Sequence, residues 1–170
     1  MAETLLKTNR FNVERHYVFI PGAGTVSRDL VVHPGAVAII PLLSPDRLVM
    51  IRNNRFCVQA ELLELPAGTL ELAEEPIDCA ARELTEETGY MAGQLEPLCW
   101  FYTSPGFTNE RMYVFVGTNM KAGIQNLDPT ERIRIQEMDL VDALEATLDG
   151  RIIDGKTIAA LHAYHYRRMK

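Results

Sequence analysis

Short apolar runs separated by turn residues fill the chain up to about residue 70 and return after residue 110, as in a sheet-rich protein. The run GAVAII at 35–40 has no polar side chain and predicts a buried strand, and SPDR at 44–47 predicts a type I turn into its hairpin partner. PGAG at 21–24 predicts another turn. The predicted strands cover residues 16–20, 25–33, 35–40, 48–52, 61–66, 111–118 and 131–138.

Three other segments have the spacing and boundary residues of helices. Pro76 suits a first helical turn and Gly89 a helix end, which predicts a central helix between them. The segment LVDALEATLD ends before Gly150, and Asp154 is a predicted cap for a last helix at 156–169. Strands, one central helix, further strands and two terminal helices indicate an α+β fold with helices layered on a sheet.

The central helix is expected to have two distinct faces. At about 100° per residue, its packing stripe comprises Ile77, Ala80, Ala81, Leu84 and Thr88. A second face, within an arc of about 100°, holds Glu83, Glu86 and Glu87. Carboxylates this close repel one another, and a hard divalent cation such as Mg²⁺ would remove the repulsion. The alternative is a solvated acidic helix face.

Residues beside this helix add to the metal interpretation. Gly68 ends the turn Leu65–Gly68 and has no side chain, so a backbone carbonyl there can approach a bound ion. Arg82 can reach back to Glu74 and tie the loop to the helix by a forked ion pair. The alternative for Arg82 is an exposed salt bridge worth under about 1 kcal/mol.

The chain has 170 residues, an ordinary globular composition and a formal net charge of −6 at pH 7. This acidity disfavours nucleic acid as a partner, because binding to its phosphates needs clustered basic residues. An anionic substrate would in turn need a cation to neutralise the repulsion. The N-terminal residues lack the order of a signal peptide and no apolar stretch is long enough for a bilayer, so a cytoplasmic protein without a membrane partner is expected.

The cysteines and histidines give weaker signals. Cys57, Cys79 and Cys99 lack the CxxC pairing of zinc and redox sites, and we expect them to be buried thiols in a reducing compartment. His162 and His165 could ligate a metal, although a helix-surface or core role is favoured because no acidic partner has matching spacing.

The segment from Gly68 to Tyr90 resembles the Nudix box at every defining position. Five residues separate Gly68 from Glu74, and seven residues separate Glu74 from the run RELTEETGY, which begins at Arg82. The resemblance implies a Nudix α/β/α sandwich around a mixed sheet. It also implies hydrolysis of a nucleoside diphosphate linked to another moiety, with Mg²⁺ as the cofactor and Mn²⁺ as a substitute.

Site roles follow from the same resemblance, position by position. It implies that Glu83 and Glu87 are the principal metal ligands, that Glu86 shares this work, and that the carbonyl of Ala67 completes the site. Glu86 and Arg82 are also expected to belong to the catalytic set.

A second motif is similar to the ADP-ribose pyrophosphatase branch of the family. SPGFTNE at 104–110 places Pro105 fifteen residues beyond Tyr90, and HPGAV at 33–37 matches the entry to the core. The similarity implies that Pro105 and Gly106 belong to the substrate-binding region, whereas the alternative is a plain turn. It also implies a homodimer in which residues 1–34 form an exchanged antiparallel β subdomain and residues 35–170 form the Nudix domain.

One stretch departs from this branch. Members usually carry Gln-x-Arg after the second core strand, and here the residues are Asn53, Asn54 and Arg55. Arg55 matches the arginine and could grip a phosphate with two bonds. The shorter Asn53 leaves the base and sugar preference open. Arg28 is a further candidate for substrate contact, with a plain surface arginine as the alternative.

The expected reaction is attack of an activated water on one phosphorus of ADP-ribose, which gives AMP and ribose 5-phosphate. Glu131, in the loop before the last predicted strand, is the first choice for the general base, with Asp128 and Glu110 as alternatives. Glu110 could instead position metal or substrate. GDP-mannose and dinucleoside polyphosphates are alternative substrates, and a non-catalytic ADP-ribose-binding module is the alternative from another class.

Overall fold

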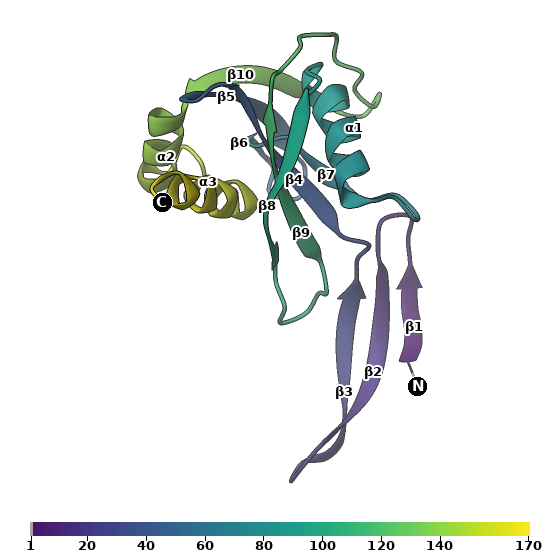
Figure 1. Ribbon diagram of the computed structural model, residues 1–170. Coiled ribbons are helices and arrows are strands. Elements are labelled where there is room, and N and C mark those ends of the chain that lie inside the picture. The colour runs from purple at the N-terminus through teal and green to yellow at the C-terminus, as the bar shows by residue number, and fades with distance from the viewer. Residues whose placement is uncertain (1) are drawn as a thin grey trace.

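The computed structural model describes residues 2–170 as a layered core with a small sheet extending from one end (Figure 1). The elements in chain order are β1 Ala2–Lys7, β2 Asn12–Ile20, β3 Gly24–Val32, β4 Ala36–Ser44, β5 Arg47–Arg55, β6 Ala60–Glu64, β7 Ala67–Thr69, α1 Pro76–Thr88, β8 Gln94–Tyr102, β9 Arg111–Thr118, β10 Ile133–Asp139, α2 Leu140–Asp149 and α3 Gly155–Arg168. The α+β class expected from the sequence is confirmed.

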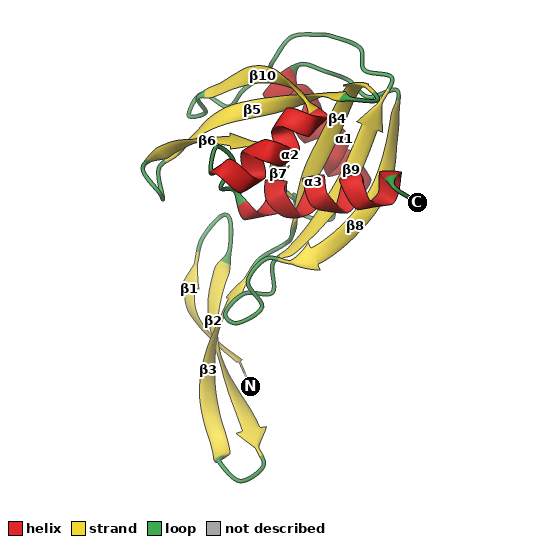
Figure 2. Cartoon of the chain, turned by 90° about the vertical axis from the view of Figure 1, so that its left-hand side faces the viewer, coloured by secondary structure: helices red, strands yellow, loops and turns green. Residues whose placement is uncertain are grey.

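The core is a mixed sheet between two helical layers. Its strand order is β10-β5-β4-β9-β8, with β6 added beside β5 and β7 beside β4. Strands β4 and β9 run parallel, and the other pairs are antiparallel. Helix α1 packs on one side, while α2 and α3 cover the other (Figures 1 and 2). The predicted α/β/α sandwich is therefore confirmed.

Strand β4 lies at the centre of this sandwich and is buried on both faces. Ile39 belongs to the apolar cluster under α1 together with Leu84, whereas Ile40 belongs to the cluster under α3 together with Leu161. All four side chains are fully buried. A strand covered on both faces has no polar side chains to alternate, which explains the uninterrupted apolar run in its sequence.

The first three strands form the predicted small antiparallel sheet, which projects away from the sandwich (Figure 1). Strands β2 and β3 pair in unbroken register from Asn12 opposite Val32 to Ile20 opposite Gly24. The end of β3 joins the loop between β8 and β9, because the Val31 N–H donates to the carbonyl of Phe107 at 2.8 Å. This sheet contacts the core mainly at one end and leaves large apolar side chains on its surface.

No pattern of apolar and polar residues predicts β1, β7 or β8. Strand β8 contains Pro97 and lies at the edge of the sheet, where a missing N–H is tolerated. Its register shifts between Pro97 and Cys99, and Trp100 is half exposed. An edge strand with a proline and a solvated face lacks the clean alternation by which strands are recognised.

The packing face of α1 was predicted partly wrongly. Ala80, Leu84 and Thr88 are buried as expected, but Ile77 and Ala81 are exposed. Cys79 and Glu87 are buried in their place. The helix is rotated toward β7, where the Cys79 thiol donates to the carbonyl of Thr69 at 3.6 Å.

Two weaker predictions concerned the cysteines and the histidines. Cys79 is buried and Cys99 partly so, but Cys57 is exposed in the hairpin between β5 and β6, so the expectation of three buried thiols is wrong. His162 forms a hydrogen bond with the Thr147 hydroxyl at 2.9 Å, between α3 and α2. None of the helices in residues 2–170 is both long and apolar enough to cross a bilayer.

Candidate active site

Helix α1 carries the acidic residues, and both of its ends lie where the sequence predicts. Pro76 is its first residue, and Gly89 ends it with φ of 72° and an N–H bond to the carbonyl of Thr85 at 2.8 Å. A Cβ on Gly89 would lie 2.8 Å from the backbone nitrogen of Gln125. Positive φ and this close approach together require glycine, so the helix ends where a later loop crosses it.

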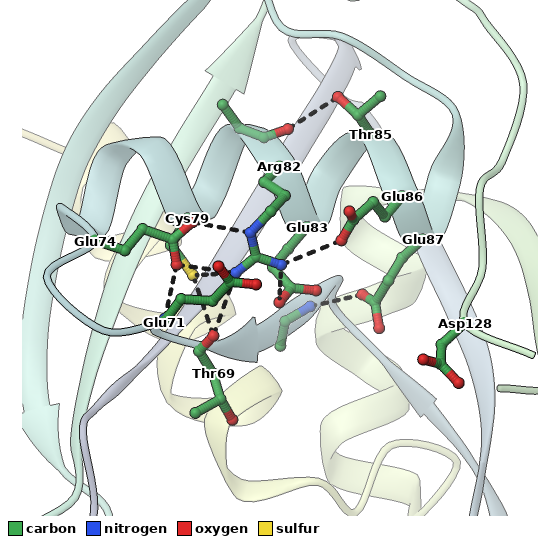
Figure 3. A network of polar contacts seen from close by, with 12 residues as sticks. Thr69, Glu71, Glu74, Cys79, Arg82, Glu83, Thr85, Glu86, Glu87 and Asp128 are labelled. Atoms are coloured by element: carbon green, nitrogen blue, oxygen red, sulfur yellow. Dashed lines mark hydrogen bonds and ion pairs between the residues drawn. The ribbon is translucent and has the colours of Figure 1, made fainter. Parts of the chain in front are cut away.

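Arg82 is the centre of the polar network on this helix (Figure 3). Its Nε and Nη2 donate to the two oxygens of Glu74 at 2.8 and 3.0 Å. Its Nη1 donates to Glu83 at 2.7 Å and to Glu86 at 3.1 Å. The expected ion pair with Glu74 is present, and Arg82 is only 27% exposed, so this is not the solvated surface pair of the alternative interpretation.

The same guanidinium holds the loop before the helix. Nη2 of Arg82 also donates to the carbonyl of Thr69 at 3.3 Å, and the N–H of Glu71 donates to Glu74 at 2.9 Å. The hydrogen bonds from Arg82 lower the pKa of Glu74 to about 2. The ion pair between Glu74 and Arg82 therefore stays ionised at all physiological pH values and holds the loop to the helix.

Glu87 is in the opposite state, a buried acid with little compensation. Its side chain accepts a hydrogen bond from the N–H of Ala67 at 2.8 Å. Burial, which outweighs the lowering effect of the Ala67 hydrogen bond, raises its pKa to about 8, and the neighbouring charge of Glu83 adds to the rise. Burial also raises the pKa of Glu83, although Arg82 opposes this. Two adjacent acids that resist ionisation are in the environment that a bound cation would relieve.

Residues 2–170 contain no closed group of three metal-ligating side chains, because the carboxylates of Glu83 and Glu86 turn toward Arg82. Mg²⁺ does not need such a cage, since it keeps several waters and takes one or two carboxylates together with substrate phosphates. The hard oxygens of Glu83, Glu86 and Glu87 on one helix face fit this requirement. The ligand roles of these residues and of the Ala67 carbonyl stay predictions.

Gly68 gives a direct test of this arrangement, because a Cβ there would overlap the carboxylate of Glu83. The Gly68→Ala variant is expected to fold, since a long side chain can swing aside, but Glu83 would leave its position. We expect turnover to fall at least tenfold while Tm shifts by no more than about 2 °C. Steady-state kinetics and thermal melting measure the two effects. Unchanged turnover would show that the position of Glu83 is unimportant.

The buried Glu87 also predicts how the metal-free protein responds to pH. Its folded-state pKa of about 8 exceeds the ordinary value of 4.5, so the folded state binds the proton more tightly than the unfolded state. The resulting stabilisation is complete below about pH 4.5 and is lost as pH rises to about 8, with a slope of up to about 1.4 kcal/mol per pH unit. Thermal unfolding in EDTA should show this slope as the difference between the unaltered protein and Glu87→Gln. Parallel curves for the two proteins would contradict it.

The loop between β9 and β10 lies against the end of α1. The N–H of Asn126 donates to the carbonyl of Glu86 at 2.9 Å, and Gln125 Nε2 donates to that of Glu87 at 2.6 Å. The negative charge of Glu131 contributes to the raised pKa of both Glu83 and Glu87, so Glu131 lies within electrostatic range of the acidic residues. Its carboxylate accepts from the N–H of Asp128 at 3.0 Å. Gln125 was not identified from the sequence, because a loop amide has no distinctive spacing.

The other predicted site residues lie elsewhere. Glu110 accepts from the Thr103 hydroxyl at 2.6 Å and lies 3.7 Å from His33, at the junction with the small sheet. Pro105 and Gly106 are exposed in the turn before it, and Arg28 is exposed on β3. The structure does not bring these residues to the α1 carboxylates within the single chain, and their roles stay predictions.

Arg55 lies at the end of β5 and is held by a buried partner that sequence reasoning missed. Its Nε and Nη2 donate to Glu64 at 2.9 and 2.6 Å, and Lys156 donates to the same carboxylate at 2.6 Å. The charge of Arg55 acts on Glu87 by lowering its pKa. A charged residue at the end of the apolar strand β6, directly before the turn at Leu65, was the available signal for Glu64.

Comparison with known proteins agrees with this geometry. The NUDIX domain pattern matches residues 32–161. The chain is 40% identical over 146 residues to a methanol dehydrogenase activator of Bacillus methanolicus, covering 85% of this chain and 79% of that protein. It is 37% identical, with the same coverage, to the ADP-ribose pyrophosphatase of Bacillus subtilis (strain 168).

A solved structure described as an ADP compounds hydrolase superposes with a TM-score of 0.84, covers 98% of this chain and 90% of its own, and shares 21% identity. At that identity the likeness supports the fold alone. The family match spans most of the chain and includes the acidic helix, the Arg82 network and the preceding glycine turn. The chain therefore belongs to the Nudix family and is a Nudix hydrolase.

Proposed function

We propose that this protein hydrolyses the pyrophosphate bond of ADP-ribose in a Mg²⁺-dependent reaction that gives AMP and ribose 5-phosphate. The observation that carries the proposal is the pair of raised-pKa acids Glu83 and Glu87 on one helix face with Glu86. The similarity to an ADP-ribose pyrophosphatase at 37% identity supports this choice of substrate. The self-repelling acids and the enzyme relative together weigh against a non-catalytic binding module.

The side chains divide the work according to their contacts. Glu83, Glu86 and Glu87 would hold the cation, which supplies charge neutralisation and a more acidic water. Arg82 fixes Glu83 and Glu86 in place and ties them to the loop through Glu74. Such fixed orientation matters because small displacements of charged groups reduce catalysis strongly.

Glu131 is our choice for the group that accepts the water proton. Its negative charge contributes to the raised pKa of Glu83 and Glu87, and its carboxylate accepts a hydrogen bond from the Asp128 N–H. Asp128 is the first alternative. Glu110 is the second, and its contacts with Thr103 and His33 suit a positioning role better.

A substrate panel tests the function. Release of nucleoside monophosphate should be measured for ADP-ribose, GDP-mannose and a dinucleoside polyphosphate, each with Mg²⁺, Mn²⁺ or EDTA. We expect kcat/KM for ADP-ribose to exceed that of the other compounds at least tenfold, with Mn²⁺ supporting activity and EDTA abolishing it. Higher kcat/KM for GDP-mannose or the polyphosphate would overturn the substrate assignment, and full activity in EDTA would overturn the metal requirement.

We also propose a homodimer that covers the exposed sheet of strands β1 to β3. Tyr17, Val18 and Phe19 are 55%, 45% and 70% exposed there, an unusual amount of apolar surface for one hairpin. Light scattering should give about twice the chain mass of 19.2 kDa. Phe19→Asp should give the single-chain mass, whereas Leu148→Asp, at an apolar position on α2 that is 81% exposed, should leave the dimer intact. Chain mass for the unaltered protein would contradict the proposal.

A further inference from the structure

Arg55, Glu64, Lys156 and Asp154 form a cluster of ion pairs that is largely buried. Glu64 is fully buried, and Lys156 is 13% exposed. Lys156 also donates to Asp154 at 2.9 Å, so two positive and two negative side chains balance. Burial by itself would raise the pKa of Glu64, but the bonds from Arg55 and Lys156 outweigh it and hold that pKa below its ordinary value. The glutamate is therefore a permanent anion inside the protein.

Stability alone does not account for this cluster. Taking charges out of water costs several kcal/mol per ion, and well-packed apolar residues often replace buried ion pairs without loss of stability. Lys156 is in addition the second residue of α3, where the helix dipole disfavours a positive charge. The dipole of α3 already has a suitable partner in Asp154, which accepts from the N–H of Thr157. A lysine placed against the dipole indicates a function for the charge.

The hydrogen bonds of the Arg55 guanidinium indicate what that function is. The Nε and Nη2 of Arg55 donate to Glu64, and no residue of the described chain accepts a hydrogen bond from the Nη1 of Arg55. Arg55 is 39% exposed, and its positive charge lowers the pKa of Glu87 in the acidic site. A guanidinium held on two nitrogens presents the third in one fixed direction, where it is free to donate to a ligand.

We propose that Glu64 and Lys156 are positioning residues that aim Nη1 of Arg55 at a phosphate oxygen of the substrate. Glu64 fixes the plane of the guanidinium, and Lys156 keeps the buried carboxylate neutralised while Arg55 shares its charge with the substrate. Glu64 directly precedes the turn that contains Ala67. The cluster therefore also holds Arg55 in place relative to the backbone of the site. The inference rests on the proposed pyrophosphatase function, since it needs a phosphate-bearing substrate.

The test is a double-mutant cycle between Glu64 and Arg55, read in two ways. KM and kcat for ADP-ribose report on turnover, and the Kd of ADP measured by calorimetry reports on diphosphate binding without turnover. We expect Arg55→Ala and Glu64→Gln each to raise KM and Kd about tenfold, with kcat changed less than threefold. In the double variant, Glu64→Gln should add nothing to Arg55→Ala, because its effect passes through the missing guanidinium.

Substitutions at two further positions separate positioning from simple stabilisation. Lys156→Met should raise Kd about fivefold and Lys156→Arg should restore it. Leu161→Ala removes a fully buried apolar side chain of α3 that takes no part in the hydrogen bonds of the cluster, and so loosens the helix. It should lower Tm by several degrees and leave Kd within twofold.

Full additivity in the double variant, or a rise in Kd for Leu161→Ala equal to that for Glu64→Gln, would overturn the positioning role. An unchanged Kd for Arg55→Ala would also overturn it. None of these results would affect the proposed function if the unaltered protein hydrolyses ADP-ribose. Conversely, failure of ADP-ribose turnover with an intact pattern of ADP affinities would reject the function and keep the positioning role.

Discussion

Replacement of Glu87 by glutamine is expected to reduce turnover about a thousandfold, the largest effect of any single substitution in this protein. Glutamine has the same shape and can still accept from the Ala67 N–H, so the buried position stays filled. It carries no charge, so it cannot replace a carboxylate as a ligand to a cation. Steady-state kinetics with ADP-ribose and Mg²⁺ measure the loss.

Folding should not suffer from this change. The metal-free Glu87→Gln variant should melt at or above the temperature of the unaltered protein at pH 8, because it no longer ionises a buried acid. Glu145→Gln, at an exposed position on α2, is the matched control and should leave both kcat and Tm unchanged. Activity of Glu87→Gln within tenfold of the unaltered enzyme would show that this carboxylate is not a principal ligand.

Replacement of Arg82 by lysine is expected to cause the second largest effect, because it damages both stability and catalysis. A lysine ammonium is a point charge and cannot fork onto Glu74 while also reaching Glu83, Glu86 and the carbonyl of Thr69. Loss of these partly buried bonds should cost about 2 kcal/mol, or a fall in Tm of about 4–8 °C. Turnover should fall about a hundredfold, because Glu83 and Glu86 lose their fixed positions.

The matched control is Arg134→Lys on β10. Arg134 pairs with Glu61 at 2.8 Å but is 71% exposed, so its ion pair contributes little. We expect Tm within about 1 °C of the unaltered protein and full turnover. If Arg82→Lys behaved like this control in both assays, the network around Arg82 would have no organising role.

Local patterns were sufficient to predict the elements that carry the site. Helix α1 runs between Pro76 and Gly89 as expected, because both signals act within one turn of a helix end. Strand β4 is buried throughout its apolar run, and the ion pair between Arg82 and Glu74 forms over eight residues of sequence. The family motif lies within this same segment, so its resemblance and the local physics describe the same residues.

Long-range contacts explain what the sequence could not predict. Glu64 and Lys156 are separated by 92 positions and belong to different layers, so no local spacing relates them. The rotation of α1 that buries Glu87 and exposes Ile77 depends on its packing against β7, which was itself unpredicted. Gln125 reaches the end of α1 only because the loop between β9 and β10 folds back over Gly89.

Calorimetric titration of the metal-free protein with Mg²⁺ at pH 7, in two buffers of different ionisation enthalpy, tests whether the glutamates of α1 bind a cation. We expect saturable binding that releases about one proton, because Glu87 is mostly protonated before the cation arrives. Glu87→Gln should release none. Absence of Mg²⁺ binding, both alone and with ADP present, would contradict the claim that these glutamates form a cation site.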